Sequence, residues 1–542
     1  MSVTAKRASR LWLLPALAAA AVVALPLAAV LVGGLLPGGD GWQHLKETVL
    51  AAYVANTLVL MLLVGLISLA IGVGSAWLVA AYDFPGRGAL AWLLVLPLAA
   101  PAYVVAYAYT DLLDVSGPLQ GWVRSAFGLG IDEFAIGGVR SLPGAAVMLA
   151  IVLYPYVYLL CRASFAGRSA APFEAARVLG LTAFQAFLRV ALPAARPAIA
   201  GGLALVLMET LADFGVVDYF ALPTFSTGIY RTWISLGDKS AALRLAALML
   251  LFVLALVVFE NASRRGRPDA RDTSRAARVR LTGSRAWLAT LACALPVTFG
   301  FVLPVLILLG LKLTTGGDPL FGRRFIDYAG NSVGVSVAAA LAATLLAVLM
   351  AYSQRLAPGR AGNALIRIGT LGYALPGMLL AVGLLGPLGV VDRNLTAWLR
   401  DHFGYGGGLL LSGTALVLVY AYVCRFLTVS YNSVQAGFAA VPEAMDAAAR
   451  SLGATRTGVL RRVHLPLIRP SVLAAALLVF VDAMRELPAT LMLRPFNFDT
   501  LATRVYRLAG DERLAEASTA ALTIVAIGLL PVLLLNRIGS RR

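Results

Sequence analysis

Long apolar stretches dominate this chain, and short polar segments separate them. Twelve stretches are long enough, at about 20 residues each, to cross the hydrocarbon core of a bilayer as a helix. We expect these spans at residues 12–36, 50–81, 88–112, 141–163, 197–221, 241–260, 286–312, 331–353, 364–390, 408–430, 470–492 and 516–536. The pattern predicts an all-α, polytopic membrane protein with about 12 transmembrane helices.

The spans fall into two sets of six that repeat one another in sequence. ANTLVL around Asn56 matches GNSVGV around Asn331, and Gly180 matches Gly453. Because an even number of spans precedes the second set, the two six-helix repeats run in parallel through the membrane. We therefore expect a first half, a cytoplasmic Arg-rich linker and a second half, at residues 1–260, 261–285 and 286–542.

Charge and composition support a membrane protein rather than a nucleic-acid-binding one. The 542 residues are 60% hydrophobic and carry a net charge of +18, but the basic residues lie at span ends and form no continuous face. Eight arginines lie between residues 264 and 285, which favours a cytoplasmic linker and cytoplasmic N- and C-termini by the positive-inside rule. The three cysteines show no disulfide or metal spacing. Of the scattered histidines, His464 is expected in a solvated loop.

Two polar segments interrupt the apolar pattern at matching places. In the first, Gly180 suits a left-handed C-cap after a short helix. Thr182 and Gln185 then form a capping box that begins a second helix, and Pro193 marks the approach to the next span. Much of this framework returns at residues 447–466. We predict a cytoplasmic helix–turn–helix in each half.

These two segments resemble the cytoplasmic coupling loop of permease subunits in binding-protein-dependent ABC importers. In the shared motif, EAA is followed by three residues of any type and then by Gly. Nine further residues separate this Gly from an aliphatic residue, and LP follows after one more residue. The matching coupling-loop residues are Glu174, Ala175, Ala176, Gly180 and Pro193 in the first half, and Ala448, Ala449, Gly453 and Pro466 in the second. The second half departs from the motif, because Ala447 takes the glutamate position and Asp446 precedes it.

The resemblance implies a non-catalytic membrane subunit that works with two copies of an ABC ATPase. The chain has no GxxxxGK[ST] phosphate loop, so we expect no cofactor on this chain and ATP with Mg on the partner subunits. Residues Arg485 to Tyr506 are similar to the corresponding part of ferric iron permeases, which are often single chains with two fused halves. This similarity implies import of ferric iron, delivered by a periplasmic iron-binding protein, across a bacterial inner membrane. Thiamine, phosphonate and polyamine permeases share the coupling loop, so these cargoes are alternatives to ferric iron.

Acidic residues inside two spans are candidates for a translocation pathway. Glu209 and Asp213 lie four residues apart and share one helix face, as do Asp482 and Glu486, with Arg485 nearby. A charge at the bilayer centre costs about 2.5 to 3.5 kcal/mol, so these side chains should face the protein interior or a wet path. Clustered carboxylates suit transient contact with a hard metal cation. Instead of lining a path, the acids could have a structural role, for example as ion-pair partners of Arg485. The alternative function for the whole chain is an ion-coupled secondary transporter that uses the same carboxylates.

Overall fold

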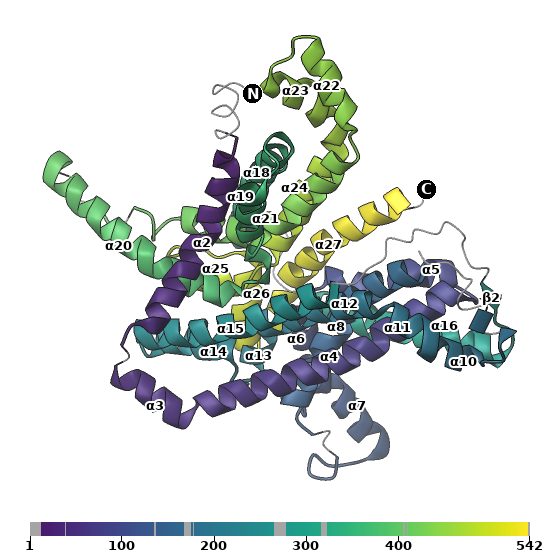
Figure 1. Ribbon diagram of the computed structural model, residues 1–542. Helices are drawn as coiled ribbons and strands as arrows, with labels where there is room; N and C mark the ends of the chain where they lie inside the picture. Colours follow the sequence, from purple (N-terminus) through teal and green to yellow (C-terminus); the bar gives the residue numbers. More distant parts are fainter. Residues whose placement is uncertain are drawn as a thin grey trace. The chain divides into compact units, whose positions relative to one another are not determined.

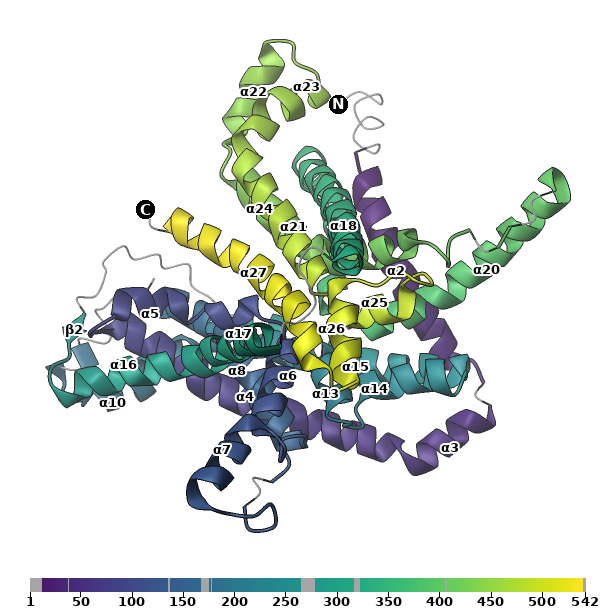
Figure 2. The same cartoon turned by 180° about the vertical axis from the view of Figure 1, so that it is seen from behind.

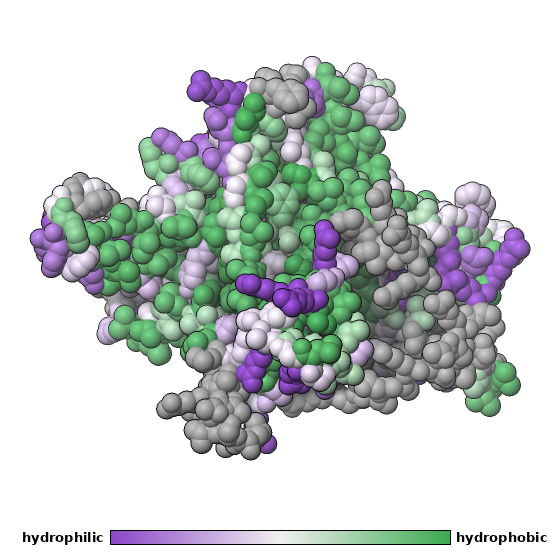
Figure 3. Space-filling view, turned by 90° about the horizontal axis from the view of Figure 1, so that it is seen from above, coloured by the Kyte–Doolittle hydropathy of each residue, from purple (hydrophilic) through white to green (hydrophobic). Residues whose placement is uncertain are grey.

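The computed structural model describes residues 12–539, apart from 38, 135–136, 167–174, 177, 265–277, 316–321, 405–406 and 409. Among these residues, ten helices are long and apolar enough to cross a membrane, or twelve if each of two bent pairs is one span. The only strands in the described part are β1 (Tyr82–Asp83) and β2 (Val279–Arg280), which pair in parallel. Hydrophobic residues cover a broad area of the face in Figure 3, as lipid contact requires. The predicted all-α polytopic class is confirmed.

The helices of the two halves follow one another in matching order (Figure 1). The first half contains α2 (Leu14–Leu35), α3 (Asp40–Thr48), α4 (Leu50–Ala81), α5 (Arg87–Leu93), α6 (Ala102–Leu113), α7 (Pro118–Phe127), α8 (Leu142–Ala166), α12 (Arg196–Ala212), α13 (Gly215–Tyr219), α14 (Phe225–Tyr230) and α15 (Lys239–Arg264). The second half contains α16 (Ser284–Val297), α17 (Leu303–Thr315), α18 (Arg323–Leu356), α19 (Arg360–Gly369), α20 (Gly377–Phe403), α21 (Ala415–Ala439), α24 (Leu465–Met484), α25 (Pro488–Leu493), α26 (Leu501–Gly510) and α27 (Leu514–Gly539).

The segments expected as third spans, 88–112 and 364–390, are both interrupted, and in the second half the unbroken span is instead Gly377–Phe403. A short 3-10 turn lies between α5 and α6, and another lies between α19 and α20. Pro101 and Pro376 follow these turns with extended backbones, at ψ values of 140° and 143°. Each proline is the N-cap of the helix that follows, and its ring favours the extended backbone seen at the residue before it, Ala100 or Leu375.

The chain forms two compact units, and each draws segments from both sequence halves. Unit 1 contains residues 1–44, 229–250 and 320–504, and unit 2 contains residues 45–228, 251–319 and 505–542. The first helix of each half therefore belongs to the unit built mainly from the other half. Helix α15 begins in unit 1 and ends in unit 2. The sequence repeats and the compact units are thus different divisions of the same chain.

Unit 1 is centred on α18, α21 and α24, with α2 packed against α19 and α20 (Figure 1). Its core joins Ala16 and Ala19 of α2 to larger side chains such as Tyr352 and Phe438. Further along α2, Gly33 permits a close approach to Leu243, because a Cβ would lie 2.7 Å from that side chain. Helix α2 is therefore an integral part of this core.

Unit 2 is centred on α4, α8 and α12, which approach one another closely at small residues. A Cβ at Gly72 would lie 2.7 Å from the side chain of Val157, and a Cβ at Gly202 would lie 2.7 Å from the backbone of Val157. Small residues at such crossings allow the dispersion contacts that stabilise helix pairs in lipid. Within the same unit, α27 packs on α17 and also contacts α6 (Figure 2).

This exchange of segments predicts that neither sequence half folds alone. Cutting the chain at the linker and expressing 1–270 or 271–542 separately should give protease-sensitive protein, because each unit then lacks helices of its core. Co-expressed halves should copurify and resist protease. Affinity purification from membranes followed by limited trypsin digestion would measure both properties, and a stable, monodisperse single half would contradict the prediction.

Candidate functional site

The turns of both predicted coupling loops have the expected backbone. Gly180 has φ of +90° and Gly453 has φ of +83°, the left-handed conformation that only glycine adopts without strain. Leu181 N donates to Ala176 O at 3.1 Å, and Ala454 N donates to Ala449 O at 3.0 Å. These 6→1 hydrogen bonds are those of a Schellman C-cap, so the two turns have the same geometry.

The second helix of each loop begins with a threonine cap. Thr182 Oγ1 accepts from Gln185 N at 3.2 Å, and Thr182 N donates to the Gln185 side chain at 3.0 Å, which confirms the capping box. In the second loop Thr455 Oγ1 accepts from Gly458 N at 3.1 Å. The helices that follow each contain one π-helical turn, η2 (Phe187–Ala191) and η6 (Leu460–His464), at equivalent positions.

The turns expose apolar side chains at matching positions. Leu179 is 84% exposed and Leu452 is 88% exposed. Ala175, Ala448 and Gly453 are also accessible, whereas Ala176 is buried. Exposed apolar groups beside a polar rim are typical of protein interaction surfaces. Glu174, the acid of the first loop, lies outside the described residues.

The acid of the second loop is engaged inside the protein. Asp446 lies in α22 (Glu443–Ser451), where one carboxylate oxygen is 2.7 Å from Arg355 Nε and the other is 2.7 Å from His464 Nε2. The His464 side chain is fully buried, so the expectation of a solvated histidine is wrong. Its burial depends on residues more than a hundred positions away in the sequence, a relation that local pattern does not reveal.

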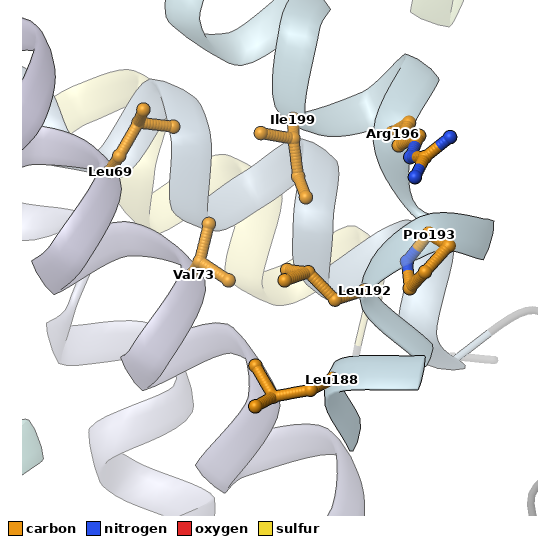
Figure 4. Close-up of a pocket in the computed structure, with 7 residues that line it drawn as sticks. All are labelled: Leu69, Val73, Leu188, Leu192, Pro193, Arg196 and Ile199. Carbon is orange, nitrogen blue, oxygen red and sulfur yellow. The ribbon is translucent and has the colours of Figure 1, made fainter. Parts of the chain in front are cut away.

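A pocket lies beside the second helix of the first loop (Figure 4). It has a cavity volume of about 390 Å³ and is lined by Leu69, Val73, Leu188, Leu192, Pro193, Arg196 and Ile199. The helix axis bends by 71° between residues 184–194 and 196–212. In the second half, residues 456–484 form one span, and Leu465 and Val472, which match Leu192 and Ile199, pack against the unit 1 core. The two loops therefore meet their spans differently.

The fifth span of each half breaks at an acidic residue that caps the short helix beyond the break. Asp213 Oδ2 accepts from Val216 N and Val217 N at 3.1 and 3.2 Å. Glu486 Oε1 accepts from Ala489 N at 3.2 Å. A carboxylate can satisfy N–H groups that have no carbonyl partner at a helix start. The predicted interruption beyond each acid is confirmed, and the acids hold its geometry.

Glu486 also forms a buried ion pair that the sequence analysis did not identify. Arg425 Nη1 on α21 lies 3.0 Å from Glu486 Oε1, and Glu486 is only 6% exposed. Gly377 leaves room for this pair, because a Cβ there would lie 2.6 Å from the Glu486 oxygen. Arg485 pairs with Asp482 instead. The structural pairing left open from the sequence is therefore present, with a different partner for each acid.

The loop beyond each short helix is held by a repeated pair of side chains. Asn56 and Asn331, on α4 and α18, donate to main-chain oxygens of residues 223 and 499, both at 3.0 Å. Each adjacent hydroxyl, Thr57 or Ser332, accepts from a main-chain N–H at 3.4 or 2.8 Å. The Asn-Thr and Asn-Ser pairs in the repeated ANTLVL and GNSVGV segments therefore fix the backbone that follows the broken spans.

The structure places the pathway acids in separate compact units. Glu209 and Asp213 belong to unit 2, and Asp482 and Glu486 belong to unit 1. Among the described residues, no group of three or more His, Cys, Asp or Glu side chains is arranged to hold a metal ion. The pathway and transient metal roles of these acids stay predictions.

A further repeat, WVRSAFG and AWLRDHFG, was missed by the sequence analysis. Trp122 and Phe127 are exposed on α7, and Trp398 and Phe403 are exposed on α20. Each of these helices ends at a left-handed glycine. The spacing W-x-R-x-x-F-G shared by both segments was the available sequence signal.

Comparison with known proteins gives one family and several relatives. The profile of the family described as binding-protein-dependent transport system inner membrane component matches residues 8–265 and 343–542. The Fe(3+)-transport system permease protein FbpB 2 of Haemophilus influenzae is 25% identical over 505 residues, which cover 90% of each chain. The sulfate permease CysW of Escherichia coli is 27% identical over 42% of this chain and 80% of its own. The molybdenum permease ModB of E. coli is 30% identical over 38% of this chain and 90% of its own.

The Arg425–Glu486 pair gives a stability prediction. Arg425→Leu or Glu486→Leu should lower the free energy of unfolding by about 3 to 5 kcal/mol, because each leaves a buried charge without its partner. The double variant should recover the part of this loss that comes from the unpaired charge, and it still lacks the hydrogen bond from Ala489 N to Glu486. Thermal unfolding in detergent would show the order of stability.

Arg485→Leu is the matched control, because the Arg485–Asp482 pair is more exposed. The side chains of Arg485 and Asp482 are 27% and 20% exposed, whereas those of Arg425 and Glu486 are 11% and 5% exposed. It should lower the unfolding temperature by less than either buried variant. If the double variant is no more stable than the single variants, an unpaired buried charge is not what lowers the stability of the single variants.

Proposed function

The chain belongs to the family of binding-protein-dependent transport system inner membrane components, and we propose that its cargo is ferric iron. It is the non-catalytic membrane subunit of an ABC importer, in which separate subunits hydrolyse ATP. One observation carries the iron proposal. The similarity to the Fe(3+) permease extends over 90% of both chains and so includes both halves, whereas the sulfate and molybdenum permeases, matched over 80% and 90% of their own length, cover less than half of this chain.

Two ATPase copies, one on each coupling loop, form the motor in this proposal. The loops have the same left-handed turns, and both expose a leucine, Leu179 or Leu452, that a partner could bury. ATP and Mg would bind to those subunits. The positive-inside bias supports cytoplasmic loops and termini, so that a periplasmic iron-binding protein would dock on the opposite side. The family match argues against an ion-coupled secondary transporter.

The proposed path passes the broken fifth spans. Interrupted helices at matching places in two repeats are typical of transport sites, because their free backbone groups and charges can meet a passing solute. Asp213 and Glu486 hold these breaks through main-chain N–H groups. We infer that the acids, with Glu209 and Asp482, give the path a polarity suited to a hard cation as substrate.

Uptake measurements would test the cargo. Cells that lack their own permease would receive this chain with its binding protein and ATPase, and accumulation of labelled ferric iron, thiamine and sulfate would be followed. Iron should accumulate, and an inactive ATPase should abolish that accumulation. Thiamine or sulfate uptake without iron uptake would refute the cargo, and uptake that survives loss of the ATPase would refute the importer mechanism.

The loop turns give a second prediction. Gly180→Ala and Gly453→Ala should each strain the turn by about 1 to 2 kcal/mol, because a Cβ disfavours the left-handed conformation. Strained turns should lower the amount of ATPase that copurifies with the chain. Gly310→Ala is the control, because this helical glycine has open space around its Cβ position. Undiminished copurification in both loop variants would contradict a docking role for these turns.

A further inference from the structure

The second coupling loop is attached to the end of α18 by one arginine. Arg355 lies in the last turn of α18 and pairs with Asp446 at 2.7 Å. The same guanidinium donates to Phe438 O at 2.9 Å and to Pro442 O at 3.2 Å. It thereby joins α18 to the end of α21, to the connection that follows and to α22. Three acceptors match the planar, multi-donor geometry of arginine better than that of lysine.

Buried rings extend this attachment to the second helix of the loop. His464 lies against Tyr352 and Phe438, with ring centroids 5.6 and 5.2 Å apart, and its Nε2 is 2.7 Å from Asp446. The Tyr352 hydroxyl donates to Arg456 O at the start of the helix α23 (Arg456–Val459). Asp446 therefore links both helices of the loop to α18, and its carboxylate lies between a cation and a buried imidazole.

The first half has different residues at the matching positions. The shift that aligns Asn56 with Asn331 places Ala80 at the position of Arg355 and Trp77 at that of Tyr352. The shift that aligns Gly180 with Gly453 places Ala191 at the position of His464. Trp77 instead packs on Phe187 and Phe165, with centroids 4.8 and 5.4 Å apart. The described part of the first loop therefore meets α4 through aromatic contact, and the pocket of Figure 4 lies beside that helix.

We propose that Asp446, Arg355 and His464 form a clamp that makes the second coupling loop and α18 move as one body. This inference rests on the proposed docking of an ATPase on each loop. The hydrogen bonds of Arg355, of which the one to Asp446 is charge-assisted, are directional and resist sliding and rotation of the loop against α18. Asp446 and Arg355 are positioning residues that transmit the ATPase motion, and they contact neither nucleotide nor cargo.

The test uses the whole importer, with the ATPase and the binding protein, in liposomes. Asp446→Asn and Arg355→Gln remove the charged contact, and Arg355→Lys retains the charge. The measured quantity is the number of ATP molecules hydrolysed per cargo transported. The loss of a charged hydrogen bond predicts that Asp446→Asn and Arg355→Gln raise this ratio about tenfold, with hydrolysis maintained. Arg355→Lys should lie nearer to wild type.

Gly310→Ala is the control, because this helical glycine lies outside the coupling loops and has open space around its Cβ position. It should leave the ratio unchanged. If Asp446→Asn leaves the number of ATP molecules per cargo unchanged, the clamp is refuted. It is also refuted if every variant loses bound ATPase while the complexes that remain assembled keep the wild-type ratio. If Asp446→Asn fails to assemble, the comparison of Arg355→Gln with Arg355→Lys decides.

Failure of the proposed function would be visible in the wild-type complex before any variant is compared. A wild type that transports a cargo other than iron still allows the ratio to be measured with that cargo. A wild type that transports without ATP would refute the importer mechanism itself. The clamp is refuted only when a coupled wild type and its clamp variants have the same ratio.

Discussion

A helix that breaks inside a membrane must find partners for its free backbone groups within the protein, because lipid supplies none. This constraint governs the fifth span of each half. Asp213 and Glu486 accept from the N–H groups beyond the breaks, and Asn56 and Asn331 donate to carbonyls of the loops that follow. Asp213 and Glu486 therefore stabilise the helix breaks, and any role in transport would be in addition to this structural role.

The two fifth spans meet this constraint with different side-chain surroundings. Glu486 meets Arg425, so its charge is balanced inside unit 1, whereas Asp213 accepts two main-chain hydrogen bonds in unit 2. A buried pair is stable only when both members are present and hydrogen-bonded. The two breaks therefore place their acids in different environments, one beside an arginine and one beside main-chain N–H groups.

The sequence was informative where a signal is local. The capping box of Thr182 and Gln185 and the left-handed turns at Gly180 and Gly453 depend on residues within one helical turn, and these predictions are confirmed. Burial of His464, the partner of Glu486 and the assembly of each unit from both halves depend on residues far apart in sequence. The third spans were predicted as unbroken because hydropathy averages over short turns such as those before Pro101 and Pro376.

Fusion of the two halves gives a physical reason for the difference between their loops. When one polypeptide carries both repeats, each loop has its own sequence, so a charged contact can arise in one without appearing in the other. The second loop has Asp446 paired with Arg355 and the first has Trp77 packed on Phe187, although the backbone turns are alike. Equal turns suit a similar partner surface, while the described side chains that pack each loop on its neighbouring helix differ in chemistry.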